Sequence, residues 1–434
     1  MNNPLTIAPL GPFHASLRLP GSKSLTNRAL LLAALADGQS TLRYPLVAQD
    51  AQRMTAALTD LGFTISAAGD AGYVVIQGGN GTISATEATL DLGNAGTAMR
   101  SLTAACCLGR GVYRLDGNPR MRQRPIGELV ALLRRLGARI DFLNQEGCPP
   151  LRVQGGGLAG GELQVTTTRS SQFITALLVI GPYCREPLTL NFEGPVTSRP
   201  YVEMTVAMMR RFGAEVQVDP QFRTIAVNAG GYRACDYTVE PDASSATYFM
   251  AAAAITPGSR CTIEGLGRQS IQGDAAFADL LHQMGAGLLF GADFITILAP
   301  DESQPLRGVD VDMNHMPDAA MTLAAIAPLC TGPTAIRNVG NLRFKETDRL
   351  AALQTELHKL SATATIEGDD LLIEPPADGR IAPASIDTYD DHRMAMSFAI
   401  PGLRHPGITI NDPECVNKTF PDFFEYLNRL GETS

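Results

Sequence analysis

The sequence predicts a mixed α/β (α+β) protein with two similar domains, each built from three copies of one helix–strand–helix–strand unit. Two patterns support this fold class. A polar helix start followed by a helix of small apolar residues recurs at intervals of roughly 74 residues, which indicates structural repetition. Between these helices an amphipathic helix recurs, and it leads into strands that alternate apolar and polar residues.

The first helix of each copy opens on a residue type whose side chain can cap a helix by accepting a backbone hydrogen bond. The six starts are Ser22, Asn94, Ser170, Ser244, Asp318 and Asp390. The helices that follow are apolar on all sides, as residues 29–36 are, so we expect them to be buried with their polar N-termini emerging. Packed round a pseudo-threefold axis, three such N-termini point one way, and two domains facing each other form a cleft of positive potential.

The second helix of each copy ends near a Leu-Gly or Phe-Gly pair in most copies. It is expected at residues 51–62, 126–137, 201–213, 274–285, 347–360 and 420–431. The sixth copy stops after this helix, and the strand-like residues 5–19 at the other end of the chain can complete it. We therefore expect a discontinuous domain of residues 1–21 with 243–434 and a continuous domain of residues 22–242. The chain passes from one domain to the other near residues 20–22 and 240–243, and these two crossings form the hinge.

Composition excludes several partners. With 434 residues, a net charge of −9 and a pI near 5.3, the chain is too acidic for nucleic acid or an anionic membrane to be its main partner. Its start lacks the cationic and apolar segments of a signal peptide, and no apolar stretch is long enough to span a bilayer. The eight cysteines show no C-x-x-C spacing, which favours reduced thiols in a cytoplasmic protein. We expect no metal, no cofactor and a monomer.

Lysine is scarce, since Lys23, Lys345, Lys359 and Lys418 are the four lysines among 35 basic residues. A bias towards arginine codons explains this simply. A retained lysine can also do what arginine cannot, because its compact ammonium group has a tunable pKa. Three of the four fall inside the motifs described next.

Residues 20–28, Pro-Gly-Ser-Lys-Ser-Leu-Thr-Asn-Arg, join a strand to the first apolar helix. A helix start with free backbone N–H groups, hydroxyls, Lys23 and Arg28 is a strong anion site. A capped helix with solvated basic residues explains the local pattern equally well. The functional interpretation gains weight because the rest of the chain repeats the arrangement.

Further polar clusters accompany the next two starts. Small residues at 92–100 let a ligand approach the backbone, and residues 118–125 carry three arginines at alternate positions, which suits a preformed clamp for a carboxylate or phosphate. Residues 168–172 and 197–201 add hydroxyls, an amide and an aromatic ring that suit a polyol or sugar phosphate. Tight packing, solvation or capping explains each cluster separately.

The densest group of charges is residues 341–349, Asn-Leu-Arg-Phe-Lys-Glu-Thr-Asp-Arg. A salt-bridged helix start is one explanation. Asp318 at the fifth start and residues 389–393 at the sixth favour another, because carboxylates beside lysines in a cationic cleft are poised as general acids and bases. Lys418 adds a cation near the last helix.

These motifs, in this order, closely resemble those of the 5-enolpyruvylshikimate-3-phosphate (EPSP) synthase family. The resemblance is carried by residues 20–28, 92–100, 120–125, 170–172, 343–350 and 391–393, and it extends over essentially the whole chain. It implies the inside-out barrel fold of enolpyruvyl transferases. It also implies transfer of the enolpyruvyl group of phosphoenolpyruvate to the 5-hydroxyl of shikimate 3-phosphate, with release of inorganic phosphate. This is a step towards chorismate and the aromatic amino acids, and a glyphosate target.

The resemblance implies two sets of binding residues. Shikimate 3-phosphate is expected on Lys23, Ser24, Arg28, Ser170, Ser171, Gln172, Ser198, Tyr201, Asp318, Asn341 and Lys345. Phosphoenolpyruvate is expected on Lys23, Asn94, Gly96, Thr97, Arg124, Gln172, Arg349, Arg393 and Lys418.

The implied chemistry is addition followed by elimination through a tetrahedral ketal phosphate. It needs an acid near C3 of phosphoenolpyruvate, a base near the 5-hydroxyl and cations on the phosphates and carboxylate. Asp318 and Glu346 are the candidates for the proton transfers, with the order between them left open. Lys23 steadies the phosphate of the intermediate, and Lys345 or His392 assists.

Two alternative functions are considered, one with a different acceptor substrate and one in a different class of protein. The sister enolpyruvyl transferases that act on UDP-N-acetylglucosamine carry a Cys in the loop where this chain has Met121-Arg-Gln-Arg124-Pro, so they are disfavoured. A non-catalytic anion-binding repeat protein is disfavoured because Asp318 and Glu346 are costly beside a phosphate unless they move protons. Ser101 stands where many family members have Pro, which can alter glyphosate sensitivity.

Overall fold

The structure, a computed structural model, describes residues 3–67, 72–166, 169–301 and 303–433. The chain forms two compact units. The continuous unit is Gly21–Val239, and the discontinuous unit is Met1–Pro20 together with Glu240–Ser434. Across the described residues, every helix is too short or too polar to span a lipid bilayer.

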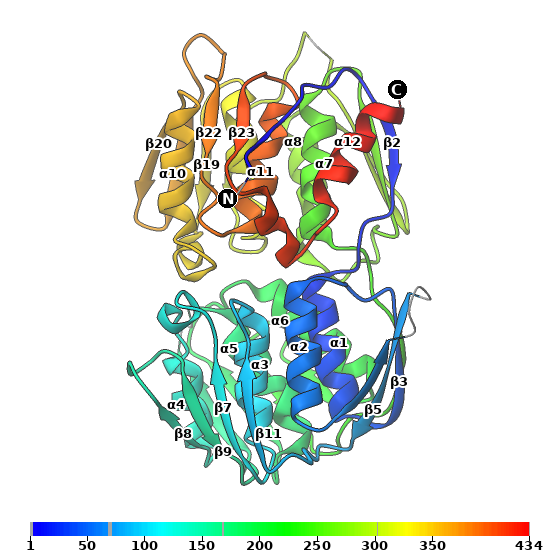
Figure 1. Ribbon diagram of the computed structural model, residues 1–434, viewed down its shortest axis with the longest axis vertical. Helices are drawn as coiled ribbons and strands as arrows, with labels where there is room; N and C mark the ends of the chain where they lie inside the picture. The colour runs from blue at the N-terminus through cyan, green and yellow to red at the C-terminus, as the bar shows by residue number, and fades with distance from the viewer. Residues whose placement is uncertain (1–2, 68–71, 167–168, 302, 434) are drawn as a thin grey trace. The chain divides into compact units, whose positions relative to one another are not determined.

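The continuous unit is built round buried helices of small and apolar residues. They are α1 (Lys23–Leu35), α3 (Gly96–Cys106) and α5 (Ser171–Ile180), and α3 packs against both of the others. Nearly every side chain on these helices is buried, so they lack the one-sided polarity of a surface helix. The amphipathic helices are α2 (Gln49–Asp60), α4 (Gly127–Arg135) and α6 (Arg199–Arg211). Figure 1 shows α1, α2 and α3 with strands β7 and β9 on one side and β3 and β5 on the other.

The sheets of this unit share one pattern, in which the first two strands are parallel and the third and fourth are antiparallel to their neighbours. Their strand orders are β14-β3-β5-β4, β6-β7-β9-β8 and β10-β11-β13-β12. The strands are β3 (Asp37–Arg43), β4 (Thr64–Ala67), β5 (Tyr73–Gly79), β6 (Glu87–Asp91), β7 (Val112–Asp116), β8 (Arg139–Phe142), β9 (Leu151–Gln154), β10 (Gly161–Val165), β11 (Leu188–Phe192), β12 (Val216–Val218), β13 (Thr224–Val227) and β14 (Asp236–Thr238).

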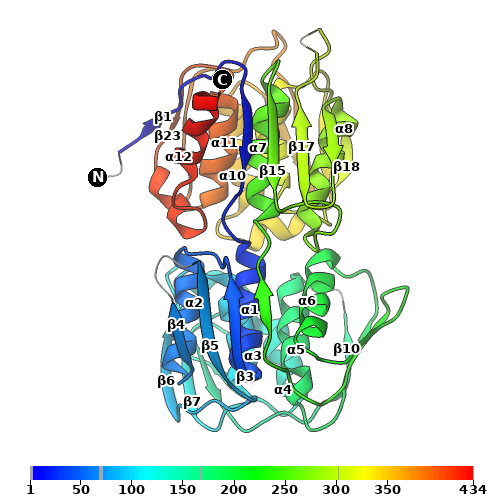
Figure 2. The same cartoon turned by 90° about the vertical axis from the view of Figure 1, so that its right-hand side faces the viewer.

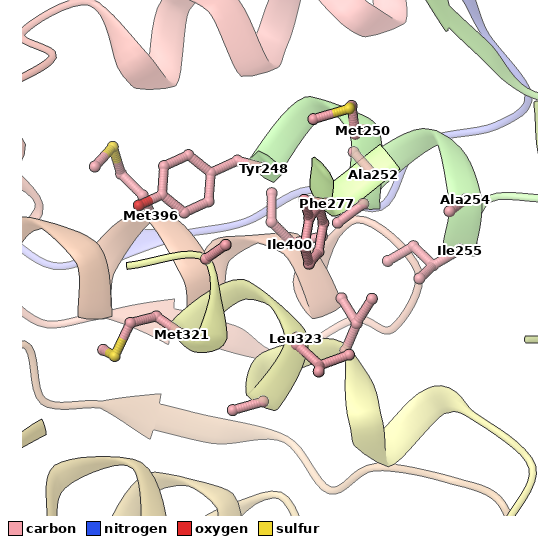
Figure 3. Close-up of a cluster of buried hydrophobic side chains, with 14 of the residues drawn as sticks. Tyr248, Met250, Ala252, Ala254, Ile255, Phe277, Met321, Leu323, Met396 and Ile400 are labelled. Atoms are coloured by element: carbon pink, nitrogen blue, oxygen red, sulfur yellow. The ribbon is translucent and has the colours of Figure 1, made fainter. Parts of the chain in front are cut away.

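The discontinuous unit repeats this plan. Its buried helices are α7 (Ala243–Ile255), α9 (Ala320–Ile326) and α11 (His392–Gly402), and each packs against the other two. Its amphipathic helices are α8 (Phe277–Met284), α10 (Arg349–Lys359) and α12 (Phe423–Arg429). Figure 3 shows the core where the buried helices meet, with Met250 of α7, Leu323 of α9 and Ile400 of α11 among the labelled side chains. Figure 2 shows β15 and β17 beside α7.

Its sheets follow the same rule, with orders β2-β15-β17-β16, β18-β19-β21-β20 and β22-β23-β1. The strands are β1 (Leu5–Thr6), β2 (His14–Leu17), β15 (Arg260–Glu264), β16 (Gly287–Phe290), β17 (Phe294–Leu298), β18 (Asp310–Asp312), β19 (Thr334–Arg337), β20 (Thr363–Glu367), β21 (Asp370–Glu374), β22 (Ala384–Ile386) and β23 (Ile408–Ile410). Short 3₁₀ helices are η2 (Met121–Gln123), η3 (Gly181–Tyr183), η4 (Gly273–Ala276), η5 (Ala327–Leu329), η6 (Gly340–Phe344), η7 (Pro413–Lys418) and η8 (Leu430–Thr433).

Two strands near the crossings between the units pair with strands that are distant from them in the sequence. β2 precedes α1 in the chain but pairs in parallel with β15, placing Leu17 opposite Ile263. β14 precedes α7 but pairs in parallel with β3, placing Tyr237 opposite Leu42. β1 takes the third place of the sixth sheet, antiparallel to β23. Residues 5–19 were expected to complete the sixth copy as a whole, but β2 lies in the sheet that follows α7.

The helix starts divide into two kinds. Ser22 and Ser170 cap α1 and α5 through their side chains, as expected. The side chain of Asp391 caps α11, so this helix starts one residue after the expected Asp390. The side chain of Asp242 caps α7, so the expected start Ser244 lies inside the first turn. Asn94 and Asp318 stand at the remaining two expected starts but contact arginine side chains instead of capping α3 and α9.

Candidate active site

The centre of the charged cluster in the discontinuous unit is Arg349, the first residue of α10 and 1% exposed. Its Nε donates to Asp391 Oδ2 at 2.7 Å, and its Nη1 donates to Asp318 Oδ1 at 3.0 Å. Its Nη2 donates to Glu346 Oε2 at 3.0 Å and to Asp391 Oδ1 at 3.1 Å. Burial by itself lowers the pKa of Arg349, but the carboxylates of Asp391, Glu346 and Asp318 outweigh it and raise that pKa.

Asp318 accepts from three basic side chains, two from residues 341–349 and one from the start of α11. Besides Arg349, Arg393 Nη2 donates to its Oδ2 at 3.0 Å, and Lys345 Nζ lies 3.5 Å from its Oδ1. Asp318 is 9% exposed, so these contacts are only weakly screened by water. A carboxylate that shares three cations in this way is held in a fixed orientation.

Glu346 is another carboxylate of the cluster that contacts Arg349. It is 7% exposed, and its Oε1 lies 3.9 Å from Lys418 Nζ at the end of η7. Lys345 and Glu346 lie between η6 and α10, and Asp348 Oδ1 caps α10 by accepting from Ala351 N at 3.2 Å. Asn341, in η6, is half-buried.

His392 begins α11 with 0% exposure, and its Nδ1 lies 3.6 Å from Asp391 Oδ1. Asp391 Oδ1 also caps α11 by accepting from Arg393 N at 2.9 Å. Arg393 Nη1 donates to Tyr248 Oη on α7 at 3.2 Å. The start of α11 is therefore connected to α7, α9 and α10 through its charged and polar side chains.

A further buried carboxyl lies near this cluster. Asp274, in η4, is 3% exposed and accepts a hydrogen bond from Ser244 Oγ. Burial raises the pKa of Asp274 to about 6, and the charge of Asp318 adds to the rise against the opposing effects of Ser244 and Arg393. Burial also raises the pKa of Tyr248 to about 12, with Arg393 opposing it. Sequence reasoning missed Asp274 and Tyr248, since neither belongs to a dense run of charges.

In the continuous unit, Lys23 is the first residue of α1, behind the Ser22 cap. Its Nζ lies 3.6 Å from Asp50 Oδ2 on α2, and the Asp50 side chain is 8% exposed. Asn27 Nδ2 donates to the Lys23 carbonyl at 3.0 Å one turn later. Asp50 was also missed, because a single Asp on an amphipathic helix ordinarily faces water.

Arg28 is buried beneath this helix start at 4% exposure. It donates to Thr205 Oγ1 at 2.8 Å, Thr175 Oγ1 at 3.4 Å, and the carbonyls of Ser24 at 2.9 Å and Tyr201 at 3.3 Å. Among the described residues all these acceptors are neutral, so the guanidinium has no carboxylate to offset its charge. Burial lowers the pKa of Arg28 to about 10.

Asn94, Gly96 and Arg124 form one contact group. Arg124 Nη1 donates to the Asn94 carbonyl at 3.1 Å and to Asn94 Oδ1 at 3.0 Å. A Cβ on Gly96 would lie 2.5 Å from Arg124 Nη2, so a glycine is required for this approach. Arg124 is 3% exposed, and Gln172 Nε2 donates to Thr97 Oγ1 at 3.4 Å beside it.

The arginine loop differs from the expected clamp of three side chains. Arg122 makes two 2.9 Å hydrogen bonds to Asp116, and Arg120 Nη1 donates to Gln123 at 3.4 Å. The 3₁₀ turn η2 breaks the alternation on which the clamp was based, so Arg124 turns inward while Arg122 pairs at the surface.

The predicted hydroxyl groups lie at the starts of α5 and α6. Ser170 Oγ accepts from Gln172 N at 3.3 Å, and Ser171 is buried at the first position of α5. Ser198 is buried with a left-handed backbone (φ 52°) just before α6, where Tyr201 follows. Thr168, in the same motif as Ser170, lies outside the described residues.

The predicted residues are therefore divided between the two units. Lys23, Ser24, Arg28, Asn94, Gly96, Thr97, Arg124, Ser170, Ser171, Gln172, Ser198 and Tyr201 belong to the continuous unit. Asp318, Asn341, Lys345, Glu346, Arg349, His392, Arg393 and Lys418 belong to the discontinuous unit. Within the described residues there is no group of three or more His, Cys, Asp or Glu side chains suited to hold a metal ion.

Comparison with known proteins identifies the family. Residues 7–427 match the family described as EPSP synthase (3-phosphoshikimate 1-carboxyvinyltransferase). The 3-phosphoshikimate 1-carboxyvinyltransferase of Serratia proteamaculans is 47% identical over 436 residues, covering 100% of both chains. That of Vibrio atlanticus is 46% identical over 429 residues, covering 98% of this chain and 99% of the relative.

Solved structures agree with this result. The EPSP synthase of Acinetobacter baumannii superimposes with a TM-score of 0.80 and 28% sequence identity, covering 99% of this chain and 98% of the other. These matches confirm the predicted α/β fold class and the family resemblance. The chain belongs to the EPSP synthase (3-phosphoshikimate 1-carboxyvinyltransferase) family.

Proposed function

We infer that this chain is a 3-phosphoshikimate 1-carboxyvinyltransferase. It transfers the enolpyruvyl group of phosphoenolpyruvate to the 5-hydroxyl of shikimate 3-phosphate and releases inorganic phosphate, as a step in aromatic amino acid biosynthesis. Its substrates are small anionic molecules.

The observation that carries the mechanism is the set of three cations on Asp318. Contacts to Arg349, Arg393 and Lys345 favour its carboxylate form and orient it, while the same cations can bind the phosphate and carboxylate of a substrate. Glu346 has a matching position between Arg349 and Lys418. Paired carboxylates among cations supply both the proton transfers and the anion binding that the reaction needs.

For shikimate 3-phosphate, the proposed anchor in the continuous unit is Arg28. A buried guanidinium with neutral partners gains most from an arriving phosphate, because the anion offsets a charge that burial disfavours. The hydroxyls of Ser24, Ser170, Ser171 and Ser198, with Lys23, Gln172 and Tyr201, complete this set. Asp318, Asn341 and Lys345 contribute from the discontinuous unit.

For phosphoenolpyruvate, the proposed contacts are Arg124, Lys23, Asn94, Gly96, Thr97 and Gln172 in one unit and Arg349, Arg393 and Lys418 in the other. Arginine matches a carboxylate or phosphate through paired N–H donors, and lysine acts as a compact charge. We propose that the two units are functional domains, bounded at the crossings 20–22 and 240–243, and that each supplies part of both substrate sets.

In the proposed reaction, the 5-hydroxyl loses its proton to a base and its oxygen bonds to C2 of phosphoenolpyruvate while C3 takes a proton from an acid, which gives the ketal phosphate. The C2–O bond to phosphate then breaks, C3 loses a proton and the double bond re-forms. Asp318 and Glu346 are the groups for these proton transfers, and Lys23, assisted by Lys345 or His392, balances the charge of the departing phosphate.

We further propose that the enzyme acts as a monomer in the cytoplasm, needs no metal or cofactor, and is inhibited by glyphosate. All eight cysteines, each within the described residues, are free, which fits a reducing compartment.

The test is phosphate release from phosphoenolpyruvate by the full chain, measured with shikimate 3-phosphate and in parallel with UDP-N-acetylglucosamine. Both reactions contain a chelator and no added cofactor. We expect release with shikimate 3-phosphate alone. Release with the nucleotide sugar alone would keep the mechanism and change the acceptor, and release with neither from folded protein would favour an anion-binding protein.

A further inference from the structure

The chain between β22 and α11 makes a tight turn that leads directly into the charged cluster. Asp391 N donates to the Thr388 carbonyl at 2.9 Å, which closes a four-residue turn with Tyr389 and Asp390 at its centre. Asp391 and Arg393 follow immediately. A displacement of this turn would therefore also move the two residues that contact Arg349 and Asp318.

The backbone of this turn is unfavourable for its residues. Tyr389 has φ 56° and Asp390 has φ 54°, so two consecutive residues with a Cβ lie in the left-handed region. Turns of this kind ordinarily carry Asn-Gly or Gly-Gly, which adopt the conformation readily. Contacts outside the turn must therefore hold Tyr389 and Asp390 in place.

Helix α10 supplies such a contact through Glu356. This residue is 0% exposed, and its Oε1 accepts from Tyr389 Oη at 2.6 Å. Its Oε2 accepts from the backbone N–H of Asp387 at 3.1 Å, so one carboxylate holds both the beginning and the middle of the segment. Lys359 Nζ lies 2.8 Å from both Glu356 and Asp387 and balances their charge.

Glu356 and Arg349 lie seven residues apart on α10, on the same face and roughly 10 Å apart along its axis. Arg349 holds Asp391 through two hydrogen bonds, and Glu356 holds Asp387 and Tyr389. One helix therefore fixes the segment at two points, one inside the charged cluster and one outside it.

We propose that Tyr389 is a positioning residue, which uses its hydroxyl bond to Glu356 to hold the 388–391 turn so that Asp391 and Arg393 meet Arg349 and Asp318. The proposal rests on the proposed function, since it assumes that Arg393 and Arg349 bind phosphoenolpyruvate. Tyr389 itself is 39% exposed, and the backbone that follows it leads into the cluster.

The experiment compares Tyr389→Phe with the unaltered enzyme, after the latter has shown activity. The variant keeps the ring and loses one hydroxyl. We expect the KM for phosphoenolpyruvate to rise roughly tenfold, because Arg349 and Arg393 belong to its proposed contacts. The KM for shikimate 3-phosphate should rise less, because that substrate is connected to the turn only through Asp318 and keeps Arg28 and its neighbours. Simple loss of folded enzyme would lower kcat and leave both KM values alone.

Tyr426→Phe is the matched control, because its hydroxyl also donates to a single acceptor, the Arg18 carbonyl at 3.4 Å, outside the charged cluster. Both KM values of this variant should remain unchanged. Inactivity of the unaltered enzyme would refute the proposed function, whereas an active enzyme with unchanged KM values in Tyr389→Phe would refute the positioning role alone.

A second variant tests the backbone strain. Glycine at position 390 adopts a positive φ without penalty, so it should make the turn less dependent on the tyrosine bond. We expect Tyr389→Phe combined with Asp390→Gly to have a KM for phosphoenolpyruvate within about threefold of Asp390→Gly alone. If Tyr389→Phe raises the KM for phosphoenolpyruvate roughly tenfold both with and without Asp390→Gly, backbone strain in the turn is not the cause of the increase.

Discussion

Arg349 and Asp391 are joined by two hydrogen bonds, from Nε to Oδ2 at 2.7 Å and from Nη2 to Oδ1 at 3.1 Å, with both side chains almost fully buried. The same guanidinium also contacts Asp318 and Glu346. One guanidinium thus contacts three buried carboxylates, and the arrangement is sensitive to the loss of that single side chain.

Arg349→Met should therefore be strongly destabilising at neutral pH. It leaves Asp318, Glu346 and Asp391 without their shared partner, and breaking a buried pair in this way costs about 3–5 kcal/mol. Urea unfolding at pH 7 measures the loss, and phosphate release should fall to background. The difference in free energy of unfolding between the variant and the parent should become smaller at acidic pH, because protonated carboxyl groups carry no charge for the cation to compensate.

Arg337→Met is the control for that variant. Arg337 also pairs with two aspartates, Asp310 and Asp370, but its side chain is 37% exposed. Exposed pairs contribute little, so the free energy of unfolding should change by less than about 1 kcal/mol. Equal losses in the two variants would contradict the role given to burial.

Asp318→Asn separates catalysis from binding. The amide cannot accept or release the proton, so kcat should fall by roughly 10² to 10⁴-fold while shikimate 3-phosphate still binds in a calorimetric titration. Asp279→Asn, on the exposed face of α8, should leave kcat unchanged. An Asp318→Asn enzyme with kcat within a few fold of the parent would remove Asp318 from the proton transfers.

Arg28→Met should impair binding without impairing folding. The buried charge has neutral partners, and two of them, Thr175 and Thr205, already share a 3.0 Å hydrogen bond that does not involve the arginine. Replacing a buried charge by an apolar group is often neutral or stabilising, so the free energy of unfolding should hold or rise. The KM for shikimate 3-phosphate should increase roughly 10- to 100-fold, as for the loss of a charge-assisted hydrogen bond. A large drop in stability with an unchanged KM would make Arg28 a structural residue.

The repeated helices and the dense charge cluster could be predicted from the sequence because their signals are local. A run of apolar residues after a capping side chain indicates a buried helix, and residues 341–349 concentrate charges that an ordinary surface does not require. The family, the fold class and the enolpyruvyl transfer that these motifs implied are confirmed by the comparisons.

Contacts between distant segments could not be predicted. Asp50, Asp274 and Tyr248 are isolated in the sequence and become part of the charged groups only when α1 meets α2 or α7 meets α11 and η4. The same holds for β2, whose pairing with β15 depends on tertiary closure and not on its own residues. Arg122 and Arg124 look equivalent in the sequence, and a three-residue 3₁₀ turn sends them in different directions.

Gly96→Ala should weaken phosphoenolpyruvate binding selectively. The new Cβ would meet Arg124 Nη2 at 2.5 Å and Cζ at 2.8 Å, so the guanidinium must move. We expect the KM for phosphoenolpyruvate to rise roughly tenfold or more and that for shikimate 3-phosphate to change little. Gly156→Ala is the control, since its Cβ would meet Arg139 at an ordinary 3.4 Å. Equal effects of the two substitutions would exclude displacement of Arg124 as the cause.

Asp274 predicts a pH dependence of stability with an unusual sign. Its pKa of about 6 in the folded protein exceeds the ordinary value of 3.8 for an aspartate, because burial and Asp318 disfavour the charged form. Between about pH 4 and pH 6 the folded state binds more protons than the unfolded state, so this group lowers stability as the pH rises through that window. Asp274→Asn should reduce this loss of stability, so the free energies of unfolding at pH 4.5 and pH 7 should differ less in the variant than in the parent. Asp310→Asn is the contrast, because Arg337 lowers the pKa of Asp310 and its exposure makes the effect small. An Asp274→Asn protein with the parent's pH profile would show that Asp274 is ionised throughout, with Arg393 and Ser244 outweighing burial.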